Sequence, residues 1–252
     1  DGFKFDFKSL LNCAYGPPVD AFGKIYVDQD IRIPTPRLPG PPYHFVSRIA
    51  HIDQNEGEFE RQPILEAEYD IPKDAWYFHD NGGIMPFSVL MEVGLQPCGW
   101  LSVYACCDLI RNKHLLYRNL DGKATVNFNI TPEHKNIKTI TKLVDTSILG
   151  EMILVAFQVE CYADEELVMQ MDTSFGYFTQ DSMLKQKGHS ITENEKNTFG
   201  LASNCKINTR ISPRVELLPG KNKLLMLDYV ECYDQNGGRT NQGYIRGVKV
   251  VS

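Results

Sequence analysis

The sequence predicts an α+β fold in which an antiparallel sheet wraps around one long central helix. The chain has 252 residues, 42% of them hydrophobic, and this is enough for a sizeable core. Between Gly82 and Cys107 the only charged residue is Glu92, and apolar residues recur there at helical spacing. Four β-type runs follow, joined by short polar turns, and no helical segment between them provides a crossover. Such strands pair antiparallel.

The elements before the helix are an N-terminal arm and a hairpin. Half of the 14 prolines precede residue 43, so we expect residues 1–40 to be a Pro-rich arm or linker with one short helix near Ser9–Ala14. A β-type run covers Tyr43–Asp53, and a polar turn separates it from a second strand at Ile64–Ile71. This hairpin opens a domain.

The central helix is predicted to begin at Pro86, since proline favours the first helical position, and to continue to Tyr104 with a kink at Pro97. Its hydropathy would also allow a membrane span. However, Glu92, Gln96 and Pro97 all fall near its middle, and no cluster of Lys or Arg flanks it. The helix is therefore predicted to be buried inside a soluble protein, and no membrane partner is expected.

The sheet continues after the helix through four predicted strands: Ala124–Ile130, Ile137–Thr146, Met152–Ala163 and Leu167–Phe178. Together with the first hairpin and the helix they form a domain over residues 41–180. The polar residues that follow, 181–215, are predicted to be a linker.

A repeat with an offset of 181 residues connects the first hairpin with the end of the chain. Asp53-Gln54-Asn55 recurs as Asp234-Gln235-Asn236. At the same offset five apolar positions match: Val46 with Leu227, Ile49 with Val230, Ile52 with Tyr233, Ile64 with Ile245, and Ala67 with Val248. Residues 216–252 are therefore predicted to be the opening hairpin of a second, truncated domain. Coincidence is the alternative, because all hairpins share alternation and turn residues.

Composition and motifs exclude several classes of function. The net charge of −6, without a long basic run, disfavours nucleic acid as a partner. The seven cysteines are scattered without a C-x-x-C pair, which predicts reduced thiols in a cytoplasmic protein and no structural zinc. Phosphate-binding loops, nucleophile elbows and H-E-x-x-H are absent. Cys98 lies in the apolar helix and is predicted to be a buried, inert thiol.

The candidate chemistry centres on His79 and Glu92. His79 is predicted to lie in a Gly-rich turn, and Glu92 follows thirteen residues later in the apolar helix, where a carboxylate is costly without a partner or a role. Two alternatives remain open. Glu92 could be a core acid bonded to Gln96 at i+4, and His79 could be a solvent-facing turn residue.

The helix pattern resembles a known family. Met85-Pro86, then Glu92 and Gln96 at these spacings, is similar to the hot-dog helix of the FabA/FabZ-like 3-hydroxyacyl-carrier-protein dehydratases, and Pro41–Ile49 resembles their opening strand. A closer resemblance is to the tandem dehydratase region of polyunsaturated fatty acid synthases and polyketide synthases. It rests on Tyr69-Asp70-Ile71-Pro72, Trp76, the run from Met85 to Gly99, and Arg118-Asn119-Leu120-Asp121-Gly122, and it covers about residues 10–252.

The resemblance implies a hot-dog fold, here part of a double hot dog, and removal of water from 3-hydroxyacyl thioesters to give 2-enoyl thioesters. His79 would take the proton from C2, and Glu92 would protonate the leaving hydroxyl. The N–H groups of Phe87 and Ser88 would bind the thioester oxygen, and Gln96 would orient Glu92 or contact the acyl chain. No metal and no cofactor are implied, because the substrate is carried on the phosphopantetheine of an acyl carrier protein.

Two positions depart from the family pattern. His79 precedes Pro86 by seven residues rather than eight, so an ungapped alignment places Phe78 at the histidine position. Phe87 stands where the family has Gly. These departures leave two alternatives open: a catalytically silent hot dog that supports an active one, or a hot-dog acyl thioesterase.

The resemblance also implies partners. In this family the histidine and the acid of one site come from opposite hot dogs, so we expect a second hot-dog domain in cis or a homodimer. An acidic acyl carrier protein needs a basic docking patch, for which Arg111, Lys113, His114 and Arg118 are candidates. The alternative is that these residues only form a solvated helix exit.

Overall fold

The structure is a computed structural model that describes residues 5–27, 35–58, 61–108, 110, 113–186, 188, 192–193, 197, 227–237 and 241–250. The chain divides into two compact units. The first comprises residues 1–75 and 84–185, and the second comprises residues 76–83 and 186–252.

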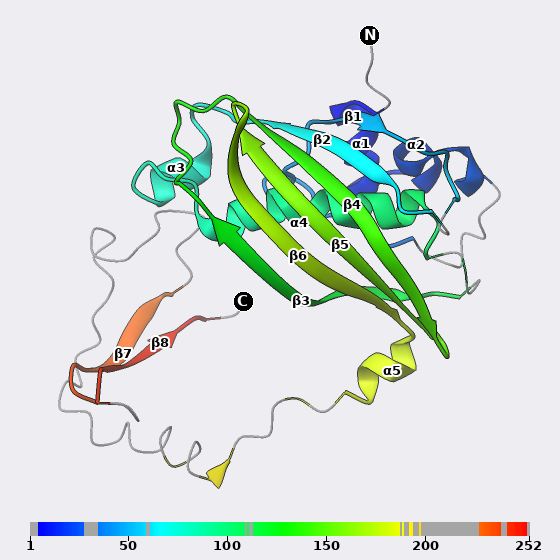
Figure 1. Cartoon of the computed structure of the whole chain (residues 1–252). Helices are drawn as coiled ribbons and strands as arrows, with labels where there is room; N and C mark the ends of the chain where they lie inside the picture. Colours follow the sequence, from blue (N-terminus) through cyan, green and yellow to red (C-terminus); the bar gives the residue numbers. More distant parts are fainter. Residues whose placement is uncertain are drawn as a thin grey trace. The chain divides into compact units, whose positions relative to one another are not determined.

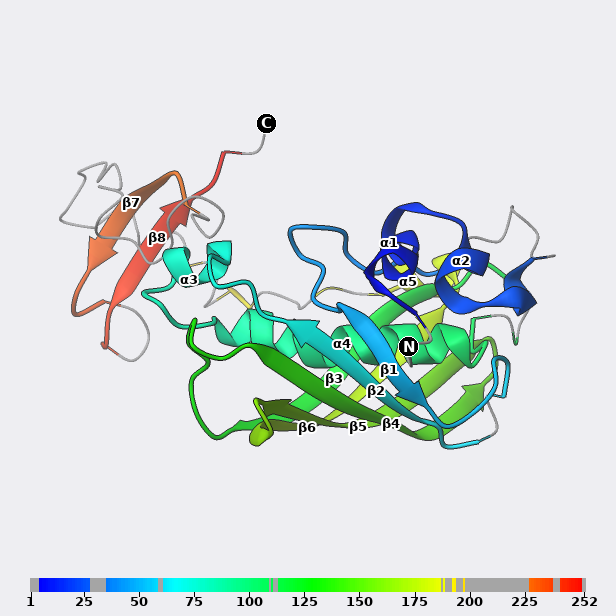
Figure 2. The same ribbon diagram turned by 90° about the horizontal axis from the view of Figure 1, so that it is seen from above.

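The first unit is built on a six-stranded antiparallel sheet with the order β1-β2-β4-β5-β6-β3. Its strands are β1 (Arg48–Ile52), β2 (Ile64–Asp70), β3 (Leu116–Val126), β4 (Asn136–Leu149), β5 (Met152–Ala163) and β6 (Glu166–Phe178). The sheet curls around the long helix α4 (Phe87–Tyr104), as two perpendicular views show (Figures 1 and 2). This is the hot-dog fold, and the predicted antiparallel sheet around a central helix is confirmed.

Helix α4 is buried on all sides from Val93 to Tyr104, because the sheet covers one flank and the N-terminal residues cover the other. Pro97 lies inside it and has no N–H for the carbonyl of Val93. That carbonyl instead accepts a hydrogen bond from the hydroxyl of Thr139 on β4, at 3.4 Å. The sheet thus satisfies the backbone group that the proline leaves unpaired.

The helix approaches the sheet closely at Gly94. A Cβ atom there would lie only 2.9 Å from Cε of Met169. One turn later, the Cys98 thiol donates to the Gly94 carbonyl, and burial raises the pKa of this thiol well above its ordinary value. The prediction that Cys98 is a buried, unreactive thiol is therefore confirmed.

The residues before β1 are also folded. The short helix predicted near Ser9–Ala14 is α1 (Phe7–Tyr15), and Asp6 caps it by accepting from the Ser9 N–H at 2.9 Å. Two further turns follow, α2 (Pro18–Phe22) and the 3₁₀ helix η1 (Lys24–Tyr26). The Trp100 indole N–H donates to the Ala21 carbonyl at 3.0 Å, which ties these turns to α4.

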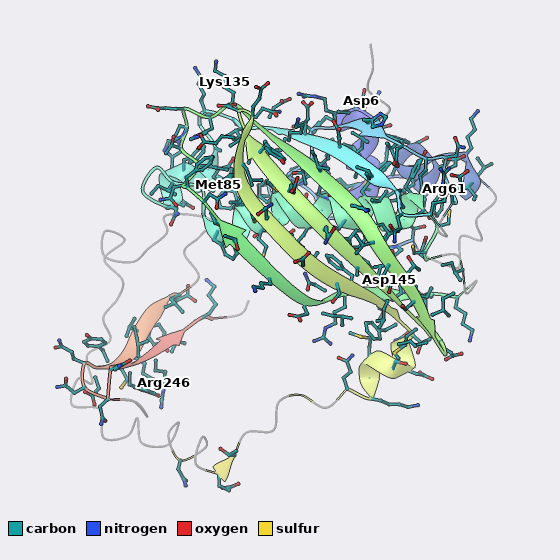
Figure 3. All side chains as sticks on the ribbon, viewed as in Figure 1. Asp6, Arg61, Met85, Lys135, Asp145 and Arg246 are labelled. Carbon is teal, nitrogen blue, oxygen red and sulfur yellow. The ribbon has the colours of Figure 1, made fainter. Side chains whose placement is uncertain are left out.

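The strand after the helix differs from its prediction. β3 (Leu116–Val126) begins eight residues before the predicted strand Ala124–Ile130. The prediction missed this start because residues 118–123 are all exposed and lack the alternation that marks a half-buried strand. The strands β4, β5 and β6 lie within three residues of their predicted bounds. One face of each of these strands is buried, and Lys135 and Asp145 lie toward opposite ends of β4 (Figure 3).

The second unit contains the short helix α3 (Trp76–Asp80) and a hairpin of β7 (Tyr229–Asp234) and β8 (Tyr244–Val248). The predicted turn around His79 is wrong, since His79 belongs to α3 and the turn follows it. The predicted linker lies mostly outside the described residues. Its start overlaps the short helix α5 (Gln180–Leu184), which belongs to the first unit.

The cysteines correct one expectation. Five of them are free and buried: Cys13, Cys98, Cys106, Cys107 and Cys161. Cys232 on β7 is disulfide-bonded, so the prediction that every cysteine is reduced is wrong. In the described ranges, no helix has the length and apolar character needed to cross a membrane.

Candidate active site

The N-terminal end of α4 presents unpaired backbone donors. Pro86 precedes the helix and provides no side-chain cap, while its carbonyl accepts from the N–H groups of Val89 and Leu90. Among the described residues, no acceptor binds the N–H of Phe87 or Ser88. Both residues are exposed, so these donors and the positive end of the helix dipole face the surface.

Glu92 and Gln96 follow one and two turns further along the helix. The Gln96 side chain is only 2% exposed and uses all of its polar atoms. Its Nε2 donates to Glu92 Oε2 at 3.2 Å and to the Tyr43 carbonyl at 2.9 Å, and its Oε1 accepts from the Phe45 N–H at 2.8 Å. Because a backbone N–H can only donate, the Phe45 contact fixes the orientation of the amide. The predicted Glu92–Gln96 bond is confirmed, and Gln96 holds Glu92 in place.

Tyr43 is a site residue that the sequence did not indicate. Burial raises the pKa of its phenol, the nearby Glu92 carboxylate raises it further, and a hydrogen bond with the Ser88 hydroxyl opposes both effects. Tyr43 therefore lies close to the first two turns of α4. The sequence predicted Tyr43 only as the first residue of the strand Tyr43–Asp53, whereas the observed strand β1 begins at Arg48.

A groove of about 560 Å³ runs along α4 in the first unit. One wall is the helix, with Glu92 and Gln96 facing the groove beside apolar residues such as Met91 and Leu95. The other wall consists of β3 and the neighbouring strand β6, and residues 37–39 close the rim. Glu92 thus contributes a carboxyl group to a largely apolar groove.

The groove depends on segments that are distant in the chain. Arg37 donates to the Asn12 carbonyl at 2.9 Å, and the Leu38 N–H donates to the Cys13 carbonyl at 3.2 Å. These bonds fix the rim to the end of α1. No pattern in the sequence indicates this contact, because residues 35–40 show neither strand nor helix periodicity.

His79, the predicted base, lies in α3 with an exposed side chain, whereas the preceding Phe78 is 3% exposed. His79 belongs to the second unit and Glu92 to the first. The sites predicted at Phe87, Ser88, Glu92 and Gln96 are thus brought together on α4. His79 is on a separate body.

The predicted docking patch is only partly basic. Lys113 forms an ion pair with Glu151, which reduces its availability to a partner. His114 and Arg118 are exposed. Arg111 lies outside the described residues.

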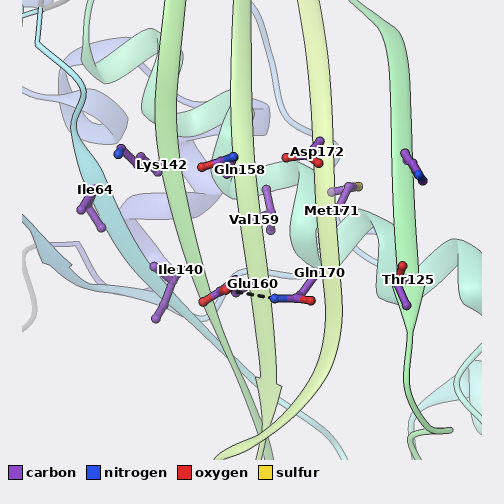
Figure 4. A pocket seen from close by; sticks show the side chains of 11 residues that line it. Ile64, Thr125, Ile140, Lys142, Gln158, Val159, Glu160, Gln170, Met171 and Asp172 are labelled. Carbon is purple, nitrogen blue, oxygen red and sulfur yellow. Dashed lines mark hydrogen bonds between the residues drawn. The ribbon is translucent and has the colours of Figure 1, made fainter.

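A second hollow, of about 530 Å³, lies on the outer face of the sheet. Figure 4 shows side chains from neighbouring strands around it, with a hydrogen bond of 3.2 Å from Gln170 Nε2 to Glu160 Oε1. Lys142 and Asp172 add opposite charges nearby. This surface has no unpaired backbone donors of a helix end, and its charges are mixed. It therefore lacks the features that mark the groove.

No cluster of three or more His, Cys, Asp or Glu side chains that could hold a metal occurs in the part of the chain that the structure describes. The groove itself contributes one carboxylate, from Glu92, together with neutral polar groups and Arg37. This donor set can position a neutral polar substrate and exchange a proton with it.

Sequence comparison identifies relatives of this region. The sequence profile of the FabA-like domain matches residues 38–172, which include α4, β3 and the first half of β6. One of the component proteins of a polyunsaturated fatty acid synthase from Thraustochytrium sp. (strain ATCC 26185 / S-3) is 38% identical over 125 residues. The match covers 48% of this chain and 8% of that protein, so the chain spans only a small part of its curated relative.

Solved structures give weaker likenesses. The dehydratase heterocomplex ApeI:P from Xenorhabdus doucetiae has a TM-score of 0.43 and 12% identity, over 58% of this chain and 91% of that chain. A hypothetical thioesterase with coenzyme A from Streptococcus pneumoniae TIGR4 has a TM-score of 0.36 and 9% identity, over 52% and 86%. The family assignment therefore comes from the sequence profile.

Proposed function

The chain belongs to the FabA-like domain family, and from that premise we propose that it contributes a dehydratase site for 3-hydroxyacyl thioesters. The reaction removes water from a thioester carried by an acyl carrier protein and leaves a 2-enoyl thioester. One observation carries the proposal: the Glu92 carboxyl group, held by Gln96, faces an apolar groove beside the free N–H groups at the start of α4.

In the proposed mechanism Glu92 is the acid. It gives its proton to the 3-hydroxyl as the C3–O bond breaks, and water leaves. An acyl chain in the groove would lie beside this carboxyl group and exclude bulk water from it. Gln96 keeps the carboxyl group aimed into the groove, because its amide is anchored to backbone atoms of Tyr43 and Phe45.

The N–H groups of Phe87 and Ser88 are proposed to bind the thioester oxygen. Loss of the C2 proton shifts negative charge onto that oxygen, and unpaired N–H groups at a positive helix end stabilise it. The phenylalanine at position 87 does not remove this donor, since the N–H belongs to the backbone. Its side chain, 53% exposed, narrows the approach to the groove instead.

His79 is proposed as the base that removes the C2 proton. A neutral imidazole is suited to this task near pH 7, and the exposed His79 side chain can reach a partner molecule. In this family acid and base come from opposite hot dogs. We therefore propose that His79 serves a site completed by a second hot-dog domain, in cis or in a homodimer, with an acyl carrier protein as the delivering partner.

The test is a turnover assay with 3-hydroxyacyl thioesters on the intact protein that contains these residues. Glu92→Gln should lower kcat/KM by about 100-fold or more, the usual contribution of a general acid. Glu133→Gln is the matched control, because Glu133 is exposed and outside the groove. It should leave turnover unchanged.

Other outcomes would contradict the proposal. Release of free acid in place of the enoyl product would indicate a thioesterase, in which Glu92 activates water. Full dehydration by both Glu92→Gln and His79→Ala would indicate that this hot dog is silent and supports an active one.

A further inference from the structure

The groove has two dissimilar ends, and Glu92 lies between them. The lining of α4 begins at Phe87, next to the free N–H groups, and its last member is Gly99. If the thioester oxygen binds at the Phe87 end, the acyl tail must run toward Gly99. This direction rests on the proposed function, whereas the shape of the Gly99 end does not.

The Gly99 end is closed by direct contact between the helix and its neighbours. A Cβ atom at Gly99 would lie 3.0 Å from Leu38 Cδ2 and 3.7 Å from Tyr117 Cε1. Tyr117 is also the first residue of β3 that lines the groove. The rim, the helix and the edge strand therefore come close together at this end of the groove.

The Tyr117 ring is held firmly in this position. It stacks on Phe175 with ring centres 4.9 Å apart and an angle of 8° between the planes, and it lies 4.8 Å from the ring of Tyr177. Tyr177 is fully buried and shares a hydrogen bond of 2.6 Å with Ser102 of α4. A ring supported on two sides by such partners forms a fixed wall and not a swinging gate.

The Tyr117 hydroxyl has no comparable role. It is buried beside Ser102, whose own hydroxyl shares a hydrogen bond of 2.6 Å with Tyr177. We therefore expect the position to depend on the ring more than on the polar group. This separates the effect of shape from the effect of hydrogen bonding, and it provides a matched variant.

We propose that the stacked rings of Tyr117 and Phe175, with Leu38 opposite, end the acyl groove and set the longest acyl chain that this site accepts. Glu92 and Gly99 are seven residues apart, which corresponds to about 10 Å along a helix. The tail beyond the reacting carbons is therefore limited to about that length. Chains that are longer must leave part of their apolar surface in water.

The test measures binding separately from turnover. Affinities of 3-hydroxyacyl-pantetheine amides of increasing tail length are determined by isothermal titration calorimetry. Each buried CH₂ should tighten binding about fourfold, equivalent to about 0.8 kcal/mol, until the tail reaches the wall. In the wild-type protein the gain should then stop. Tyr117→Ala should extend the series by at least one further fourfold step, and Tyr117→Phe should keep the wild-type limit.

Two further variants secure the result. Tyr162→Ala makes the same substitution on the outer face of the sheet and should not move the limit. Gly99→Ala adds a methyl group in front of Leu38 and should make the series stop earlier, with the longest accepted probe at least fourfold weaker. If Tyr117→Ala does not fold, the Gly99→Ala variant still tests the proposal. It is expected to fold because alanine has a higher helix propensity than glycine.

The outcomes separate the two proposals. If the longest tail that still gains affinity is the same in the wild type, in folded Tyr117→Ala and in Gly99→Ala, the proposal that Tyr117, Phe175 and Leu38 end the groove is wrong. Absence of dehydration with a shifting binding limit would overturn the proposed function alone.

Discussion

The hairpins β1–β2 and β7–β8 have first strands of matching backbone geometry, but the registers of their second strands differ by one residue. Both are antiparallel, and in each the pairing skips one residue of the first strand: Ala50 in β1 and Glu231 in β7. These two bulge residues are 181 positions apart, the offset of the sequence repeat. The equivalence of Ile49 with Val230 is therefore supported by backbone geometry as well as by side-chain type.

The second strands are not related by the same offset. Ile49 pairs with Ala67, whereas Val230 pairs with Gly247, which lies 180 residues after Ala67. The matches of Ile64 with Ile245 and of Ala67 with Val248 are therefore wrong by one residue. The connection in the second hairpin is one residue shorter, and a shift of one in a strand exchanges its two faces.

Burial shows the consequence of this difference. In β2, Leu65 is fully buried, and Ile245, its equivalent by register, is 58% exposed. β2 also pairs with β4 and lies against α4, while β8 pairs only with β7 in the described sheet. Pairing within a hairpin is thus a local property, whereas burial of one of its faces depends on what the rest of the fold supplies.

The largest effect should come from truncating the two equivalent side chains. Leu65→Ala removes a fully buried side chain and should lower the free energy of unfolding by about 2–5 kcal/mol. Ile245→Ala should change it by no more than about 0.5 kcal/mol. Urea unfolding followed by far-UV circular dichroism measures both. Equal losses would show that the second hairpin is packed as tightly as the first.

The next effect concerns Gln96, whose side chain anchors the segment that precedes β1. Gln96→Met keeps the size of the side chain but leaves the buried Phe45 N–H without its acceptor, at a cost of about 1–3 kcal/mol. Gln62→Met is the control, since it removes only an exposed bond to the Val144 carbonyl and should cost about 0.5 kcal/mol or less. Similar losses for the two variants would mean that the anchor is dispensable.

A smaller effect is expected at the ion pairs. Arg48 binds Glu68 and Asp70, and its side chain is 22% exposed, against 37% for Arg246 beside Glu231. Arg48→Met should cost about 1 kcal/mol or less, and Arg246→Met should cost less than that. Chemical denaturation at low and high salt measures both. A larger loss for Arg246→Met would show that the ion pair of the second hairpin contributes more to stability than the ion pairs of Arg48 in the first.

The smallest effect is a pH dependence. A hydrogen bond from Arg48 holds the pKa of Asp70 below its ordinary value of 3.8, and Asn136 contributes further. Because the folded pKa is the lower one, Asp70 stabilises the fold above the unfolded pKa, and this is lost as the pH falls through the folded pKa.

The stability gap between the wild type and Asp70→Asn should thus narrow between about pH 5 and about pH 2. The urea midpoint at each pH gives this gap. Asp228 beside the second hairpin also has a lowered pKa, from the Val250 N–H and Lys249, but it is exposed and should show a weaker trend. A stability difference between the wild type and Asp70→Asn that widens in acid would contradict the lowered pKa of Asp70.

The accuracy of the sequence predictions followed the burial of each element. The bounds of α4 were predictable because Pro86 and the apolar run mark a helix start and a buried body. The strands β4 to β6 were predictable because one face of each is buried and the residues alternate. β3 was misplaced because six successive exposed residues, 118–123, carry no such pattern.

The candidate site divides in the same way. Glu92 and Gln96 were found from their spacing, since residues four apart on a helix are neighbours whatever surrounds them. Tyr43, Leu38 and Tyr117 were not found, because their contacts with α4 join segments that are far apart in the chain. The exposure of His79 agrees with the alternative of a solvent-facing residue, but the helix α3 that contains it was missed.

The sequence by itself therefore determined the helix, its carboxyl group and the partner that holds it, together with the first strand of each hairpin. These features depend on periodicity and on neighbours along the chain. Only the tertiary structure decided where the groove ends and which hairpin is buried. Both depend on pairing across the sheet, above all on β3 lying beside β6, and such long-range contacts leave no local signal in the sequence.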